Sequence, residues 1–167
     1  MIKVQWLQLL GKISKLFMDH PKRVGVFLIA EGNNPHFQWI IEGTLAIGSR
    51  PGYAPGLETN VPLSAVKEWI DQAQNLGIRS IICLLGNDQL PLYHSALPNG
   101  LILYYQEMGF SVVHIPTNDG LTVPFTAQQL DETWDAFCQL PEPVLVHCSA
   151  GHDRTGRVIN ELLARIE

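Results

Sequence analysis

The chain has 167 residues, of which 46% are hydrophobic and 16% are charged, and its formal net charge is −5. This length suits a single domain, and the composition supplies a hydrophobic core and excludes a disordered chain. The acidic balance argues against a partner bound through bulk electrostatics, so no nucleic acid is expected. Any anion site is therefore expected to be a local positive spot on an acidic surface.

The three cysteines, Cys83, Cys138 and Cys148, have neither an even count nor the spacing of metal ligands. Cysteines that form no disulfide framework indicate a protein of a reducing compartment. The start of the chain has no run of about 18 apolar residues and no signal-peptide cleavage pattern. We therefore expect a cytoplasmic protein without a membrane span.

The first residues predict an amphipathic helix, because residues 2–18 place apolar side chains largely on one helical stripe. We assign this helix to residues 1–20 and a single catalytic domain to residues 21–167. Such a helix packs on the domain or docks to a partner chain, and the latter would give a homo-oligomer. A helix lying on a membrane surface is the alternative, although only three lysines precede Asp19.

Strands and helices alternate along the rest of the chain. Strands are predicted over 23–30, 36–41, 44–48, 79–85, 111–115 and 143–146, and helices over 65–76, 99–108, 127–140 and 157–166. Ser64 and Thr126 are the predicted N-caps, with Glu68 in the first turn after Ser64. The alternation predicts an α/β fold, a central, mostly parallel sheet flanked by helices. Such sheets bind ligands at the carboxyl ends of their strands.

The most informative stretch is His-Cys-Ser-Ala-Gly-His-Asp-Arg-Thr-Gly, residues 147–156, between the last predicted strand and the last predicted helix. A loop that opens a helix presents free N–H groups and the positive end of the helix dipole, so it can hold an anion. Next to these groups and Arg154, Cys148 is expected to ionise readily and act as a nucleophile. Arg154 can pair two phosphate oxygens, and Gly151 permits a tight turn. The alternative is that Cys148 is a buried structural thiol.

This string resembles the signature His-Cys-x5-Arg-Ser/Thr of the cysteine-dependent protein tyrosine phosphatase superfamily, and its Arg-Thr-Gly ending is similar to the compact dual-specificity branch. The resemblance implies a phosphate loop in which Cys148 forms a cysteinyl-phosphate, Arg154 clamps the phosphate and Thr155 helps the thiolate to leave. It further implies that His147 orients the loop. The implied phosphate cradle is the set of backbone N–H groups of Ser149, Ala150, Gly151, His152, Asp153 and Arg154.

Asp119 is the candidate general acid, because the leaving oxygen needs a proton. It follows the predicted strand 111–115, lies in a loop punctuated by Gly and Pro, and precedes Cys148 by 29 residues. The resemblance places the acid on such a loop and implies that it activates water in the second step. The alternative is an ordinary Asn-Asp-Gly turn.

Two further residues are candidates. Arg50 follows the predicted strand 44–48, where the resemblance suggests substrate binding at the mouth of the site; the alternative is a solvated loop arginine. Cys83 ends a central predicted strand near the expected position of Cys148. We hypothesise a disulfide between these two cysteines under oxidation, against the alternative of a core cysteine. Cys138 is interpreted as packing.

The sequence therefore predicts a phosphomonoester hydrolase that acts on phosphotyrosine, and on phosphoserine or phosphothreonine if its pocket is shallow. Its partner would be a phosphorylated protein or a small phosphomonoester. No metal and no cofactor is expected, because Arg154 and the backbone donors carry the transition-state charge. The pair His152-Asp153 looks like lipid-acting relatives, so a phosphoinositide or inositol-phosphate phosphatase is one alternative. A non-catalytic phosphate-binding module is the other.

Overall fold

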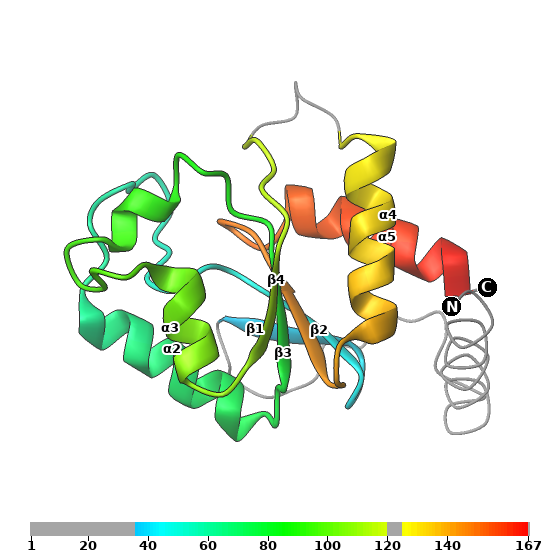
Figure 1. Ribbon diagram of the computed structural model, residues 1–167, viewed down its shortest axis with the longest axis horizontal. Helices are drawn as coiled ribbons and strands as arrows, with labels where there is room; N and C mark the ends of the chain where they lie inside the picture. The colour runs from blue at the N-terminus through cyan, green and yellow to red at the C-terminus, as the bar shows by residue number, and fades with distance from the viewer. Residues whose placement is uncertain (1–35, 120–124, 167) are drawn as a thin grey trace.

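The computed structural model describes residues 36–119 and 125–166. The predicted helix within residues 1–20, its homo-oligomer contact and the predicted strand 23–30 lie outside these residues. A five-stranded sheet forms the centre, in the order β1-β2-β5-β3-β4 (Figure 1). The strands are β1 Phe37–Ile41, β2 Leu45–Gly48, β3 Ser80–Cys83, β4 Ser111–His114 and β5 Val144–His147. Only β1 pairs antiparallel within this sheet, so the predicted mostly parallel α/β sheet is confirmed.

Helices cover both faces of the sheet (Figure 1). α2 Leu63–Asn75 and α3 Leu101–Glu107 lie on one face, and α4 Ala127–Gln139 and α5 Asp153–Ile166 lie on the other. A 3-10 turn, η1 Leu90–Tyr93, interrupts the loop after β3. Among the described residues, no helix is both long enough and apolar enough to cross a membrane.

The inner strands β2, β5 and β3 are almost wholly buried because helices cover both faces of the sheet, whereas most residues of the edge strands β1 and β4 are partly exposed. Alternate residues of a strand point to opposite faces, so Ile82 and Val146 join the cluster under α4 and α5, whereas Ile81 and Leu145 join the cluster under α2 and α3. β3 and β5 are buried at every position. This explains why their sequences are continuous apolar runs rather than alternating ones.

The two predicted helix caps have different outcomes. Thr126 caps α4, and its side chain accepts the N–H of Gln129 while the Gln129 side chain reaches back to the Thr126 N–H. The prediction for Ser64 is wrong, because α2 begins at Leu63 and its N-cap is Pro62, which makes no side-chain cap bond. The earlier start also moves Glu68 out of the first turn. Pro62 itself keeps an extended backbone with a ψ of 150°, and the helical conformation starts at the next residue.

The register of the parallel strands places four chain segments at one edge of the sheet. Gly48 of β2 and Cys83 of β3 both align with His147 of β5, and His114 of β4 aligns with Cys83. The segments that leave these residues therefore start side by side at the carboxyl edge. All residues predicted to act on substrate follow one of these strand ends, where open α/β sheets bind ligands.

Thr126, which caps a helix, and Ser64, which does not, give a matched test of capping. Thr126→Ala removes the cap of α4 and should lower the free energy of unfolding by about 1 kcal/mol. Ser64→Ala removes a hydroxyl that caps nothing and should change the stability by less than about 0.5 kcal/mol. Urea unfolding of both variants and the wild type measures the difference; equal losses would contradict the observed caps.

Candidate active site

Cys148 is the first residue after β5 and is 2% exposed. Its Sγ atom accepts a hydrogen bond from the backbone N–H of Gly151 at 3.3 Å. The loop from Ser149 to His152 curls around the sulfur and leads into the first turn of α5 at Asp153. The sulfur therefore lies at the amino end of a helix, where backbone N–H groups and the helix dipole favour negative charge.

Gly151 makes this curl possible. Its φ is +79°, a left-handed conformation that side-chain-bearing residues rarely adopt. A Cβ atom added at this position would lie 2.6 Å from the carbonyl oxygen of Gly48 and 2.9 Å from the backbone nitrogen of Ser49. The phosphate-loop backbone therefore packs directly against the end of β2, and only glycine fits there.

Arg154 lies in the first turn of α5 and is 4% exposed. Its Nη1 donates to the carbonyl oxygens of Leu84 and Thr117, each at 3.1 Å, and to Oε1 of Gln89 at 2.9 Å. These acceptors follow β3 and β4, so two neighbouring loops fix one arm of the guanidinium. Its Nη2 pairs with Oδ2 of Asp119 at 3.3 Å.

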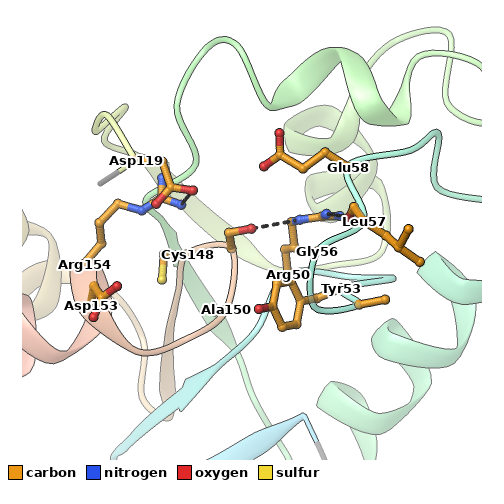
Figure 2. A pocket seen from close by; sticks show the side chains of 12 residues that line it. Arg50, Tyr53, Gly56, Leu57, Glu58, Asp119, Cys148, Ala150, Asp153 and Arg154 are labelled. Atoms are coloured by element: carbon orange, nitrogen blue, oxygen red, sulfur yellow. Dashed lines mark hydrogen bonds and ion pairs between the residues drawn. The ribbon is translucent and has the colours of Figure 1, made fainter. Parts of the chain in front are cut away.

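Asp119 stands at the rim of the site with 48% of its side chain exposed. Its Oδ2 atom faces Nη2 of Arg154 and also accepts from Nε2 of Gln89 at 3.3 Å. Figure 2 shows Asp119 and Arg154 extending toward each other beside Cys148. The thiol and the guanidinium, both predicted from residues 147–156, and the carboxyl group, predicted from the loop after strand β4, thus meet in one place.

A cavity of about 280 Å³ joins these residues (Figure 2). Loop 53–58 forms the wall opposite Arg154, and Leu57 on it is 57% exposed. The cavity holds positive charges at both ends and carboxylates at its rim. Its lining consists of Arg50, Tyr53, Ala54, Gly56, Leu57, Glu58, Asp119, Cys148, Ser149, Ala150, Asp153 and Arg154.

Arg50 is not a solvated loop arginine, since only 1% of it is exposed. Its backbone N–H donates to the carbonyl of Ser149 at 2.9 Å, and its Nε donates to the Ser149 hydroxyl at 3.1 Å. Its Nη2 donates to the carbonyl oxygen of Leu57 at 3.3 Å. Arg50 therefore ties the phosphate loop to loop 53–58, in addition to lining the cavity.

The remaining predicted loop residues differ in their surroundings. Ser149, Ala150 and Asp153 line the cavity, whereas His152 is exposed and is not part of the lining. Thr155 is fully buried, and its Oγ1 has no hydrogen-bond partner within the described part of the chain.

His147 is a buried neutral support beneath the loop. Burial lowers the pKa of its imidazole from 6.5 to about 4. Its Nδ1 lies 3.1 Å from the carbonyl oxygen of Cys148, which can only accept, so Nδ1 carries the proton. Its Nε2 then accepts from the hydroxyl of Tyr105 at 3.1 Å. Trp69 stacks on Tyr105 and donates from Nε1 to the carbonyl of Ser49 at 2.9 Å.

The structure does not bring Cys83 to face Cys148. Cys83 packs in the cluster under α2 and α3, and Cys148 packs in the cluster under α4 and α5, on the other face of the sheet. Burial also raises the pKa of the Cys83 thiol to about 12, which disfavours the thiolate that disulfide formation requires. These observations favour the alternative, a core cysteine.

Three residues that support the site, namely Gln89, Trp69 and Tyr105, were not predicted from the sequence. Trp69 and Tyr105 lie within the predicted helices 65–76 and 99–108, and the helical pattern does not show that the indole N–H of Trp69 or the hydroxyl of Tyr105 also makes a hydrogen bond. Gln89 carried one usable signal, since it is a polar residue in the loop that follows the carboxyl end of the buried parallel strand β3. The described residues contain no group of three or more His, Cys, Asp or Glu side chains that could hold a metal ion.

The geometry defines a class, an α/β phosphatase with a thiol and an arginine on one phosphate loop, and the family comparison agrees. Residues 56–166 match the family model described as the polymorphic toxin system DSP-PTPase phosphatase. The match spans more than half of the chain, so the chain belongs to this family and is a phosphoric monoester hydrolase of the cysteine-dependent tyrosine phosphatase superfamily.

Solved structures agree on the fold. Kinase-associated phosphatase with its catalytic cysteine changed to serine is 23% identical, with 74% of this chain and 66% of that chain covered and a TM-score of 0.57. A mutant form of Tk-PTP is 21% identical, with 78% and 72% covered and a TM-score of 0.53. A putative phosphatase (DUF442) from Shewanella putrefaciens CN-32 is 17% identical, with 73% and 67% covered and a TM-score of 0.51. No curated protein matches the sequence.

Gly151→Ala should disable the site. The substitution forces a residue with a Cβ into a left-handed conformation and against the backbone of β2, so the loop must shift. A displacement of about 1 Å at reacting groups can cost roughly 10²-fold in rate. We expect a loss of this order in the hydrolysis of para-nitrophenyl phosphate. Gly156→Ala is the control, because a Cβ there meets no atom within 4 Å; a comparable loss in both variants would contradict the packing argument.

The buried His147 makes stability depend on pH. Between about pH 6.5 and pH 4 the unfolded chain binds a proton at this histidine that the folded chain does not bind. The free energy of unfolding should therefore fall as the pH drops through this window, by about 3 kcal/mol from this residue. Urea unfolding of the wild type and His147→Gln across this range isolates the effect; parallel pH curves would contradict it.

Proposed function

We propose that the chain hydrolyses phosphate monoesters through a cysteinyl-phosphate intermediate. In the first step, the Cys148 thiolate attacks phosphorus, the bond to the leaving oxygen breaks, and Asp119 gives its proton to that oxygen. In the second step, the same carboxylate takes a proton from water, which attacks the phosphocysteine and releases inorganic phosphate and the thiolate. Atoms and protons balance over the two steps.

The observation that carries this proposal is the meeting of Cys148, Arg154 and Asp119 in one cavity at the carboxyl edge of the sheet. The guanidinium has one arm fixed by protein acceptors, while Nη2 faces the carboxylate. A substrate phosphate arriving here competes with Asp119 for this arm. It would thereby free the carboxyl group to turn toward the leaving oxygen.

The other residues support the same chemistry. The N–H groups of the loop from Ser149 to Arg154 would bind the equatorial oxygens of the phosphate. The buried Thr155 hydroxyl, which has no partner in the described part of the chain, would donate to the departing thiolate. Arg50 would act mainly through Ser149 by holding the loop in shape.

We infer a protein-tyrosine or dual-specificity activity, acting on phosphorylated proteins or small phosphomonoesters in the cytoplasm. A phosphotyrosine ring entering the cavity would meet the apolar side chains of loop 53–58, which include the exposed Leu57. The family description supports a setting in a polymorphic toxin system. No cofactor is required by this mechanism.

Two variants test the roles of the thiol and the carboxyl group. Cys148→Ser should abolish hydrolysis of para-nitrophenyl phosphate. Asp119→Asn should lower kcat by roughly 10²-fold or more and flatten the basic limb of the pH profile, because no acid is left to lose its proton. Steady-state kinetics across pH measures both effects.

Glu58→Gln is the matched control for the carboxyl group, because Glu58 lines the same cavity but has no described contact with Arg154. We expect it to keep the basic limb. Turnover by Cys148→Ser at the wild-type rate, or an Asp119→Asn profile with an unchanged limb, would refute the assigned roles.

A further inference from the structure

We propose that Gln89 is a positioning residue that holds Arg154 and Asp119 in a fixed relative position through the two ends of one neutral amide. The inference rests on the proposed function in one respect, the assignment of Asp119 as the general acid. It goes beyond that function, because it assigns a part to a residue outside the phosphate loop and outside the acid loop.

The contacts of Gln89 are unusual for a loop glutamine. The residue is 2% exposed, although it lies in the loop between β3 and η1. Its Oε1 accepts from Nη1 of Arg154 at 2.9 Å and from the backbone N–H of Gly86 at 3.3 Å. Its Nε2 donates to Oδ2 of Asp119 at 3.3 Å. One side chain thus bridges the guanidinium and the carboxyl group.

The orientation of this amide is fixed by its neighbours. Arg154 and Gly86 both direct N–H groups at Oε1, and these donors cannot accept a hydrogen bond. The carboxylate of Asp119 faces Nε2. A flipped amide would set its NH₂ group against two donors and its oxygen against a carboxylate. The backbone N–H of Gln89, which donates to the carbonyl of Gly86 at 3.0 Å, anchors the residue in a tight turn.

Glutamine suits this place because it is neutral and has both a donor and an acceptor. An ionised glutamate would still accept from Arg154, but it would turn a second carboxylate toward Asp119 and offer no donor. A methionine of similar size would offer neither bond. The amide therefore supports a carboxyl group that must release a proton in one step and recover it in the next, without adding a charge.

Several charged or titratable groups surround Asp119 and contribute to any pH effect. Arg154 pairs with it directly, and the other such groups of the cavity are Arg50, Tyr53, Glu58, Asp153 and the Cys148 thiol. The adjacent loop adds Asp88, which is exposed. Gln89→Met leaves all of these groups in place and adds no charge, so a change in its pH profile reports on the loss of the amide. Gln89→Glu also leaves them in place but adds a carboxylate beside Asp119, so its profile reports on the added charge together with the lost donor.

The experiment compares two substrates with different leaving groups in Gln89→Met, Gln89→Glu and Asp119→Asn. Para-nitrophenyl phosphate has the better leaving group and needs less help from an acid, whereas phenyl phosphate has a poorer leaving group and depends on the acid more strongly. The kcat and kcat/KM values of each variant are measured for both substrates across pH. Gln74→Met is the control, because the Gln74 amide donates to the carbonyl of Met108 at 3.1 Å, remote from the cavity. Thermal unfolding verifies that each variant folds.

We expect Gln89→Met to lose at least tenfold more activity on phenyl phosphate than on para-nitrophenyl phosphate. The basic limb should move to higher pH in both Gln89 variants, by about one pH unit in Gln89→Glu, because a like charge or a lost donor makes Asp119 keep its proton. Gln74→Met should match the wild type. If Gln89→Met does not fold, the position of the basic limb in the pH profile of Gln89→Glu is the test of the proposal.

Equal losses on both substrates together with an unmoved basic limb would overturn the inference and leave the proposed function intact. If Asp119→Asn itself showed no greater loss on phenyl phosphate and kept the basic limb, the assignment of Asp119 would fall, and the part given to Gln89 with it. The substrate dependence and the basic limb of the Gln89 variants and of Asp119→Asn therefore distinguish a failure of the Gln89 inference from a failure of the Asp119 assignment.

Discussion

The site depends on the buried guanidinium of Arg154. Protein acceptors bind its Nη1, whereas its Nη2 faces the carboxylate of Asp119. Removing the charge of Arg154 from water is costly unless hydrogen bonds replace the lost hydration. The carbonyl oxygens of Leu84 and Thr117 and the amide of Gln89 supply that replacement from two neighbouring loops. Once this arm is fixed, the direction of the other arm is fixed as well, because the guanidinium is planar. An anion in the cavity therefore meets a preorganised donor.

The phosphate loop is held in shape from below and from the side. Below it, neutral His147 bonds the carbonyl of Cys148 and receives the Tyr105 hydroxyl, so a chain of buried hydrogen bonds runs from α3 to the loop. From the side, Gly151 touches the backbone at the end of β2, and Arg50 bonds Ser149. These contacts leave the loop little freedom, which is what electrostatic stabilisation of a transition state requires. Most of them use backbone atoms, so they constrain residue type at only a few positions.

The parallel sheet converts these local contacts into a site. Four aligned strands end at one edge, and their loops bring together residues as far apart in the sequence as Arg50 and Arg154. The antiparallel strand β1 sits at the sheet margin and contributes no residue to the lining of the cavity. The sheet topology explains this difference between β1 and the parallel strands, because only the carboxyl ends of the parallel strands open toward the cavity.

The sequence by itself determined the sheet, the helices and the phosphate loop. Apolar strands, helical stripes and a strand–loop–helix motif with cysteine and arginine at set positions are local patterns, and local patterns can be read along the chain. It also singled out Asp119, whose loop is punctuated by Gly and Pro. Only the tertiary structure decided that Arg50 is buried, that Cys83 and Cys148 occupy different faces of the sheet, and that Pro62 rather than Ser64 is the N-cap of α2. Only the tertiary structure showed that Gln89 contacts Arg154, because the local sequence around either residue does not encode a hydrogen bond between residues 65 positions apart. Such contacts depend on strand register and side-chain direction, which the folded chain sets and the linear pattern does not encode.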